Sequence, residues 1–306
     1  MVADNLPYLN ECGLPLNAVD WLETHHQSKF VERRQMVQNL NLRRGSLLID
    51  AGCGPGMWTP LLAEAIGSEG HIIGVDISIE ALITARQRSR DAWYRHLVEY
   101  KQAALEQLPV TPGTADTIFS ANVSQYLPQP VETFAAMGRY LANDGRLIIK
   151  DIDFGTMRFH SIDAALQARV LQARERWEQA RVAEGFAFED SWVGSKLAGY
   201  LREAGYKQVQ ERSYRIVRHY PLPADFRQYL QGIAEWFVSE KAPYLASGDI
   251  THWLHCFLDE RHNVLDQENF ASEETEYVVS GVWAGRSSSN IRYFDMQRGL
   301  PVETLP

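Results

Sequence analysis

The chain has 306 residues, of which 45% are apolar, and its 30 Lys and Arg against 39 Asp and Glu give a formal net charge of −9. This acidic balance argues against a nucleic-acid partner, which requires clustered positive charge, and no apolar stretch approaches the roughly 20 residues of a membrane span. Three cysteines (Cys12, Cys53 and Cys256) cannot form a disulfide framework, and the N-terminus lacks a signal-peptide pattern. We therefore expect a cytoplasmic protein whose partner is a small molecule or a protein, with the oligomeric state left open.

Strands and helices alternate along the first half of the chain. An amphipathic run over Ala18–Leu40 comes first. The pattern then predicts strands at Leu47–Ile49, His71–Val75, Val98–Gln102, Asp116–Ser120 and Arg146–Lys150, and helices at Met57–Ile66, Ile79–Arg90 (with Ser78 as N-cap) and Val131–Tyr140. Strands that alternate with helices indicate a parallel sheet covered on both faces. We expect a doubly wound α/β fold.

The second half is less regular. We expect helices at Ser161–Glu184, Val193–Ala204, Ala224–Glu240 and Thr251–Val264, and strands at Tyr206–Val217 and Glu276–Trp283. Two helical insertions then interrupt one sheet. The predicted organisation is an N-terminal helical cap over 1–42, a nucleotide-binding core over 43–152, and over 153–306 the remainder of the same sheet with insertions that form a substrate lid.

A glycine-rich loop is the sharpest motif. The residues Asp50-Ala51-Gly52-Cys53-Gly54-Pro55-Gly56 directly follow the first predicted strand and precede a helix. Glycines let the backbone approach a ligand closely, and the next helix presents unpaired N–H groups. Asp76 ends the second strand, twenty residues after Gly56, where an acidic side chain meets ribose hydroxyls in doubly wound nucleotide sites. The glycine spacing departs from the dinucleotide fingerprint G-x-G-x-x-G, which disfavours an NAD-dependent oxidoreductase.

The spacing Asp50-x-Gly52-x-Gly54-x-Gly56 resembles motif I of the class I S-adenosylmethionine-dependent methyltransferases. Three further segments resemble later motifs of that family in the same order: Leu105–Pro109, Asp116–Asn122 and Leu141–Ile149. The resemblance covers about Arg43–Ile152 closely and the last two strands loosely. It implies a Rossmann-like sheet of seven strands with S-adenosylmethionine as cofactor and S-adenosylhomocysteine as product.

The resemblance also implies roles for single residues. The expected cofactor-binding residues are Asp50, Gly52, Cys53 and Gly54 around the methionyl part, Asp76 at the ribose, Ile77, Ala104 and Leu105 around adenine, Asn122 below the sulfonium, and an N-terminal arginine (Arg34, or its neighbour Arg33) at the methionyl carboxylate. Many relatives carry Asp at the position of Ala104. Because the alanine side chain cannot accept a hydrogen bond from the adenine amino group, we expect adenine recognition to rely on main-chain groups and apolar contact, with Gln102 or Glu106 as candidates to compensate.

The acceptor side is less defined by sequence. The stretch His219–Phe257 carries eight aromatic residues, which form either a lid over an aromatic acceptor or ordinary packing between helices and sheet. General-base candidates are His160, His219 and Tyr8, each of which is also explained as an ordinary surface or core residue. A base is optional, since the sulfonium donor already carries its leaving group.

The segment from His252 to His262 spaces three histidines, Cys256 and Asp259 along one helical face, but no second cluster completes a metal site, and we expect none. The leading hypothesis is a methyltransferase (EC 2.1.1.-) that acts on oxygen or nitrogen of a small apolar or aromatic metabolite by in-line displacement. The alternatives are a protein or peptide methyltransferase and a non-catalytic module that binds S-adenosylmethionine. The acceptor itself, and whether carbon is methylated instead, stay open.

Overall fold

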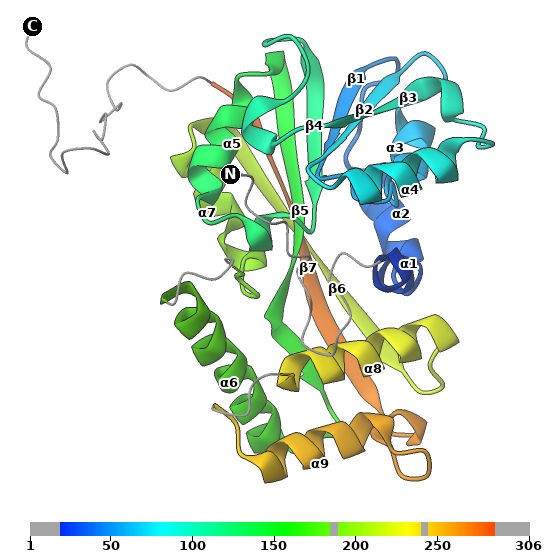
Figure 1. The fold of residues 1–306 in the computed structure, drawn as a ribbon, viewed down its shortest axis with the longest axis vertical. Coiled ribbons are helices and arrows are strands. Elements are labelled where there is room, and N and C mark those ends of the chain that lie inside the picture. Colours follow the sequence, from blue (N-terminus) through cyan, green and yellow to red (C-terminus); the bar gives the residue numbers. More distant parts are fainter. Residues whose placement is uncertain (1–18, 184–188, 240–243, 285–306) are drawn as a thin grey trace, which may run out of the picture.

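A seven-stranded sheet with the order β3-β2-β1-β4-β5-β7-β6 forms the centre of the molecule (Figure 1). The computed structural model describes residues 19–183, 189–239 and 244–284. The strands are β1 (Leu47–Ala51), β2 (His71–Asp76), β3 (Val98–Gln102), β4 (Ala115–Ala121), β5 (Leu141–Phe159), β6 (Tyr206–His219) and β7 (Ala271–Trp283). Strands β1 to β5 run parallel, and β7 is antiparallel to both of its neighbours, β5 and β6. The predicted doubly wound Rossmann-like fold is confirmed.

Helices cover both faces of this sheet. Their bounds are α1 (Val19–Gln27), α2 (Phe30–Asn39), α3 (Thr59–Ile66), α4 (Ile79–Ser89), α5 (Pro130–Gly138), α6 (Ala164–Ala183), α7 (Leu197–Glu203), α8 (Ala224–Val238) and α9 (Ser247–Leu258). Apolar residues of α2 and α3 pack on one face, and those of α5 and α7 on the other. Helix α4 begins as predicted, because the Ser78 hydroxyl accepts the Ala81 N–H at 3.2 Å. The helices thus leave the carboxyl ends of β1, β2 and β4 as the shared edge on which a site can form.

The last three strands of the sheet are longer than predicted. Strand β5 continues nine residues past Lys150, and β7 pairs with it as far as Phe159 opposite Ser272. Asp151, Asp153 and Gly155 interrupt the apolar run that follows Arg146, so the sequence pattern does not predict this extension. Pairing with β7 keeps the segment in the strand. In Figure 1 the extended ends of β5, β6 and β7 leave the rest of the sheet and carry α6, α8 and α9. The insertions are therefore built on the sheet itself.

A separate hydrophobic core lies under these insertions. It joins the distal half of β5 to α6, α8 and α9 through buried residues that include Phe159, Val170, Phe237 and Trp253. Trp21 of α1 belongs to the same core and stacks on Tyr229 of α8, with ring centroids 6.0 Å apart. The N-terminal helices are thereby fixed to the insertions as well as to the sheet.

The predicted amphipathic run Ala18–Leu40 is two helices, with a break at Ser28 and Lys29. The Ser28 hydroxyl donates to the backbone oxygen of His25 at 3.0 Å, and Lys29 lies fully buried, 2.7 Å from Glu274 of β7. The break allows the chain to turn this lysine into the interior. Within the described ranges, no helix has the length and apolar character that crossing a bilayer requires.

Candidate active site

The glycine loop lies against the end of β2. The Gly52 and Cys53 N–H groups donate to the backbone oxygen of Val75 at 2.7 and 3.0 Å, which holds the loop over the sheet edge. Gly52 has a φ of +75°, and a Cβ atom there would run into the side chain of Val123. Only glycine fits this position without strain. The Gly52 backbone therefore packs directly against Val123, and both residues line the cavity in which the sequence places the methionyl part of the cofactor.

Asp76 is held at the same edge by two backbone groups. Its Oδ2 accepts the Gly54 N–H at 2.8 Å, and its Oδ1 accepts the Ser78 N–H at 2.9 Å. Burial raises the pKa of Asp76, although these backbone hydrogen bonds act in the opposite direction. The carboxyl group is therefore fixed in position, with lone pairs left for hydroxyl donors of a ligand.

Asp50 does not lie beside the expected methionyl site. It is buried beneath the loop, where Thr59 Oγ1 donates to it at 3.5 Å, and it does not line the pocket. Burial, followed by the charge of Asp76, raises the pKa of Asp50 to about 7. Its side chain supports the loop from behind.

A cavity of about 390 Å³ begins at the loop and passes between α1, α8 and the carboxyl ends of the strands. Eight of the ten expected cofactor-binding residues line it: Gly52, Cys53, Gly54, Asp76, Ile77, Ala104, Leu105 and Asn122. Among the polar candidates for adenine, Glu106 also lines the cavity, whereas Gln102 does not and donates instead to the Ile77 backbone oxygen. The sequence motifs thus converge on one cavity.

Arg33 lines the cavity, and Arg34 does not. The Arg34 guanidinium is half exposed and pairs with Glu64 at 2.9 Å, which removes it from the expected cofactor contact. Arg33 is 2% exposed; its Nη1 lies 2.9 Å from His26 Nδ1, and its guanidinium stacks over Trp58 at 5.1 Å. Its Nε and Nη2 atoms have no hydrogen-bond partner among the described residues. These two atoms form the edge of a guanidinium that binds a carboxylate with two parallel hydrogen bonds.

Aromatic side chains form the end of the cavity away from the loop. The rings of His25, Trp21 and Tyr229 contact one another, with His25 at 6.3 Å from Trp21 and 5.3 Å from Tyr229, and Phe154 packs on Trp236 at 4.7 Å. The aromatic stretch is divided between two places: Tyr229 and Trp236 line the cavity, whereas Phe226, Phe237, Trp253 and Phe257 pack in the core.

Four buried charged residues lie beside this aromatic end, and we call them the buried ion cluster: Lys29, Lys150, Glu274 and Glu276. Lys29 Nζ lies 2.7 Å from Glu274 and 3.3 Å from Glu276, and Lys150 Nζ lies 2.8 Å from Glu276. Burial alone would raise the pKa of Glu276, but the nearby Lys150, Lys29 and Arg33 charges outweigh it and lower the pKa to about 2. The sequence interpretation missed the cluster. Its one local signal is Lys150, which directly follows the buried run Leu147–Ile149.

The proposed base candidates do not reach the cavity. His160 is half exposed, 3.9 Å from Glu273, and His219 is exposed at the end of β6. His160 directly follows β5, which continues well beyond its predicted end at Lys150. His219 is the last residue of the long strand β6, so both histidines lie at the distal ends of these strands. Tyr8 lies outside the described residues. Among the histidines of the described ranges, it is His25 that lines the cavity.

The histidines of α9 and the following turn form surface ion pairs. His255 and His262 lie 3.3 and 3.4 Å from Asp259, and all three side chains reach solvent. Across residues 19–183, 189–239 and 244–284, no three His, Cys, Asp or Glu side chains are grouped as a metal would need.

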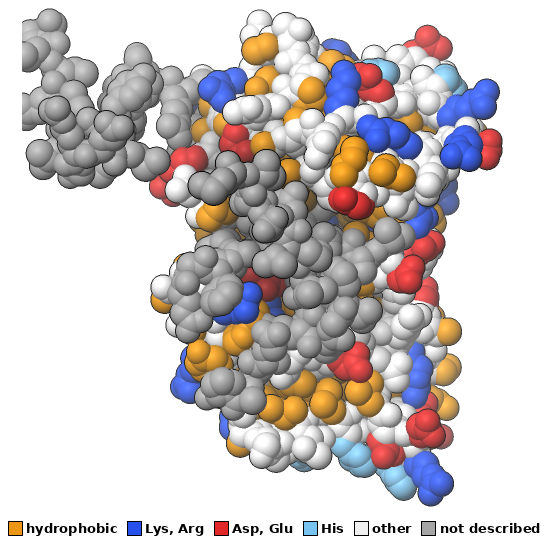
Figure 2. Space-filling model, in the orientation of Figure 1, with side chains coloured by type: hydrophobic (Ala, Val, Ile, Leu, Met, Phe, Trp, Pro, Cys, Tyr) orange, Lys and Arg blue, Asp and Glu red, His pale blue; other side chains and the backbone are white. Residues whose placement is uncertain are grey.

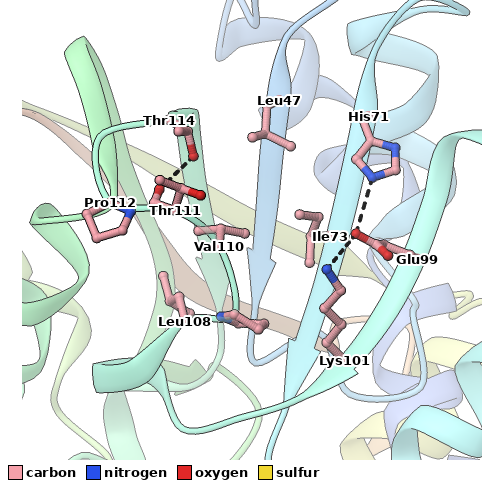
Figure 3. Close-up of a pocket in the computed structure, with 11 residues that line it drawn as sticks. Leu47, His71, Ile73, Glu99, Lys101, Leu108, Val110, Thr111, Pro112 and Thr114 are labelled. Atoms are coloured by element: carbon pink, nitrogen blue, oxygen red, sulfur yellow. Dashed lines mark hydrogen bonds and ion pairs between the residues drawn. The ribbon is translucent and has the colours of Figure 1, made fainter.

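A second, shallow hollow lies at the opposite edge of the sheet (Figure 3). Leu47 and His71, the first residues of β1 and β2, line it, and Glu99 bridges His71 and Lys101 at 3.5 and 2.8 Å. Ligands of open α/β sheets bind outside the carboxyl ends of the strands. This hollow lies by the amino ends of β1 and β2, so the cavity at the glycine loop is the candidate site.

Comparison with known proteins gives the family. A family model described as a methyltransferase domain matches residues 42–209. A 37.1 kDa protein in transposon TN4556 of Streptomyces fradiae is 31% identical over 171 residues, which are 56% of this chain and 46% of that protein, so the chain spans less than half of that relative's length. Demethylmenaquinone methyltransferase of Staphylococcus saprophyticus is 22% identical over 191 residues, 60% of this chain and 79% of that enzyme.

Solved structures agree on the fold. YcgJ of Bacillus subtilis superposes with a TM-score of 0.50 at 15% identity, over 85% of this chain and 99% of that one. A Bacillus halodurans protein superposes with a TM-score of 0.51 at 14% identity, over 81% and 97%. At such identities the likeness concerns the fold alone. With the ordered motifs, the strand order and the matched domain together, the chain belongs to the class I S-adenosylmethionine-dependent methyltransferases.

Proposed function

We propose that the protein transfers the methyl group of S-adenosylmethionine to an oxygen or nitrogen atom of a small aromatic or apolar metabolite, with S-adenosylhomocysteine as the second product. The observation that carries this proposal is the continuous cavity that runs from the glycine loop and Asp76 to a wall of aromatic rings. Holding donor and acceptor in line in such a cavity can supply about 7–11 kcal/mol of the barrier lowering.

The cofactor contacts are distributed along the loop side of the cavity. We assign the methionyl part to Gly52, Cys53 and Gly54, the ribose hydroxyls to Asp76, and the adenine edge to Ile77, Ala104 and Leu105. Glu106 serves the adenine amino group in place of the aspartate that Ala104 replaces: its Oε1 accepts the Thr133 hydroxyl at 2.5 Å, which leaves Oε2 for the ligand. Asn122 lies at the floor between the cofactor and acceptor ends.

The methionyl carboxylate is assigned to Arg33 in place of Arg34. Arg33 stacks on Trp58, which follows the glycine loop closely in sequence, and its unpartnered Nε and Nη2 edge matches a carboxylate. Buried guanidinium N–H groups without hydrogen-bond partners are costly, so a bound carboxylate would recover that free energy.

The acceptor end favours an aromatic or apolar molecule. Trp21, Phe154, Ile233 and Trp236 line it, and aromatic pairs of this kind bind flat rings by stacking and exclude water. Two relatives carry names that refer to quinones, demethylmenaquinone methyltransferase and 2-phytyl-1,4-naphtoquinone methyltransferase. Those names describe the relatives, and they are consistent with a flat acceptor here.

Calorimetric titration with S-adenosylhomocysteine tests the cofactor part. We expect saturable binding by the wild-type protein, a loss of at least about tenfold in affinity for Arg33→Gln, and no change for the neighbouring surface substitution Arg34→Gln. Absence of binding by the wild-type protein would refute the proposed function. Equal losses in the two variants would refute the assignment of Arg33.

Tritium-labelled methyl transfer in a cell extract tests the acceptor part. Labelled small products support the proposal, labelled macromolecules support a protein methyltransferase, and no labelled product at all supports a non-catalytic module. On the face drawn in Figure 2, positive and negative side chains of the described residues are interspersed. Such a surface does not resemble the basic stripe of a nucleic-acid enzyme, and we expect label in small molecules.

A further inference from the structure

The buried ion cluster orients Asn122 at the floor of the cavity. Lys150 Nζ donates to Asn122 Oδ1 at 2.7 Å, and an ammonium group has no lone pair with which to accept. The amide oxygen is therefore occupied by Lys150. The amide nitrogen, with its two N–H groups, is the part of Asn122 that remains for a molecule in the cavity.

The same cluster fixes the proton of His25. Burial, together with the charges of Lys29, Arg33 and Lys150, lowers the pKa of His25 well below its usual value, so the imidazole is neutral. Its Nε2 lies 3.3 Å from Lys29 Nζ, which can only donate. The single ring proton is consequently on Nδ1. Contacts with the rings of Trp21 and Tyr229 hold the imidazole in place, and because His25 lines the cavity it also offers a donor.

Tyr229, Asp76 and Glu106 are not available to accept a proton from a molecule at the aromatic end of the cavity. The Tyr229 hydroxyl donates to Glu274 at 2.7 Å and accepts from Lys29 at 3.0 Å, so it is engaged inside the cluster. Among the described residues that line the cavity, the carboxylates are Asp76 and Glu106, and both belong to the nucleoside side. Among the described residues, the acceptor end thus presents N–H donors and aromatic rings, and no carboxylate or histidine lone pair lines it to act as a base.

We propose that this end of the cavity selects an acceptor whose reacting oxygen is already ionised, a phenolate or a carboxylate on an aromatic body. This inference rests on the proposed function and narrows its substrate class to oxyanions. The acceptor oxygen uses a lone pair to form the new bond to the methyl carbon, while the carbon–sulfur bond breaks and its electron pair stays on sulfur. The oxygen becomes neutral, and no proton has to leave.

Binding of matched anionic and neutral probes tests the proposal. The protein is saturated with S-adenosylhomocysteine and titrated with 2-naphthoate and with 2-naphthamide, which have the same ring and nearly the same shape, by ligand-observed NMR. A second pair, 4-nitrophenolate and 4-nitroanisole, distinguishes a phenolate from a carboxylate. We expect at least one anion to bind about tenfold more tightly than its neutral partner, as a charge-assisted hydrogen bond predicts.

Variants of His25 separate its proton from its ring. His25→Phe keeps an aromatic ring but removes the donor, and we expect the affinity for the anion to fall several-fold more than the affinity for 2-naphthamide, while S-adenosylhomocysteine binds as before. His25→Asn places an amide N–H near the position of Nδ1 and is expected to restore part of the preference. His160→Phe makes the same chemical change at a half-exposed position outside the cavity and serves as the matched control.

Two results would overturn the inference without touching the proposed function. One is equal binding of the anionic and neutral members of both pairs to the wild-type complex. The other is an anion preference that survives in His25→Phe and disappears in Arg33→Gln, because it would place the anion on the guanidinium. Failure to bind S-adenosylhomocysteine, in contrast, is the outcome that removes the proposed function itself.

Discussion

Replacing Glu276 with Gln tests the central interaction of the buried ion cluster. Glu276 is the carboxylate partner of Lys150 at 2.8 Å and a second partner of Lys29 at 3.3 Å. All three side chains are fully buried. The substitution keeps the shape of the side chain and removes its charge, so that Lys150 loses its counter-ion in the interior.

The expected loss of folding free energy follows from the pKa of the Glu276 carboxylate. Its pKa is lowered from 4.5 to about 2, and at about 1.4 kcal/mol for each tenfold change this corresponds to about 3 kcal/mol of folding free energy. Removing one partner of a buried pair typically costs about 3–5 kcal/mol, which agrees. Because the folded-state pKa is depressed, the stabilisation is present above about pH 4.5 and is lost as the pH falls toward about 2.

Urea unfolding of the wild-type protein and Glu276→Gln at several pH values measures this effect. We expect a difference of about 3 kcal/mol near pH 7 that narrows to about 1 kcal/mol near pH 3. Comparing the two proteins cancels the titration of Asp50 and Glu178, whose pKa values burial raises to about 7. Glu273→Gln on the same strand is the control, since Glu273 pairs with the exposed Arg215 and surface pairs contribute at most about 1 kcal/mol.

A loss below about 1 kcal/mol near pH 7 would contradict the argument, because it would mean that Lys150 finds other solvation when its partner is removed. A large loss that stays constant down to about pH 3 would also contradict it. That result would attribute the effect to packing in the sheet, and the charge of Glu276 would then contribute nothing measurable.

Three further substitutions address the cavity. Asp76→Asn is expected to lower the affinity for S-adenosylhomocysteine about tenfold or more in calorimetry, with unchanged circular dichroism, and unaltered affinity would refute the ribose contact. Gly52→Ala should destabilise the fold by about 1–3 kcal/mol and weaken cofactor binding, because its φ of +75° and the neighbouring Val123 both oppose a side chain; normal thermal stability would count against this. Trp236→Ala should reduce methyl transfer at limiting acceptor while cofactor affinity stays normal, and a fall in cofactor affinity instead would place Trp236 at the wrong end.

The cofactor side of the cavity was predictable because it depends on local chain order. In a parallel sheet the carboxyl ends of β1 and β2 are neighbours, so a glycine loop after one and Asp76 after the other must meet. The positions of Gly52, Cys53, Gly54 and Ile77 in the cavity follow from that rule. Asp50 is the exception in this motif. It is the residue before the last one of β1, and its side chain is buried beneath the loop.

The acceptor side depends on long-range packing, which no local pattern encodes. The choice between Arg33 and Arg34 is decided by the helix break at Lys29, and that break is stabilised by carboxylates about 245 residues later in the sequence. Likewise, His160 was plausible only while β5 was thought to end near Lys150. Pairing with β7 carries β5 on to Phe159, so that His160 and His219 lie at the distal ends of β5 and β6.

The position of β7 has a consequence for synthesis of the chain on the ribosome. Residues Arg146 to Asp153 of β5 pair with Val282 to Thr275 of β7, so the edge of the cofactor-binding sheet is closed by a strand that is translated more than a hundred residues later. Until β7 emerges, β5 presents unpaired backbone groups of the kind that promote aggregation. The nascent protein therefore has to keep this edge protected by its insertion helices, or by a chaperone, until the last strand is available.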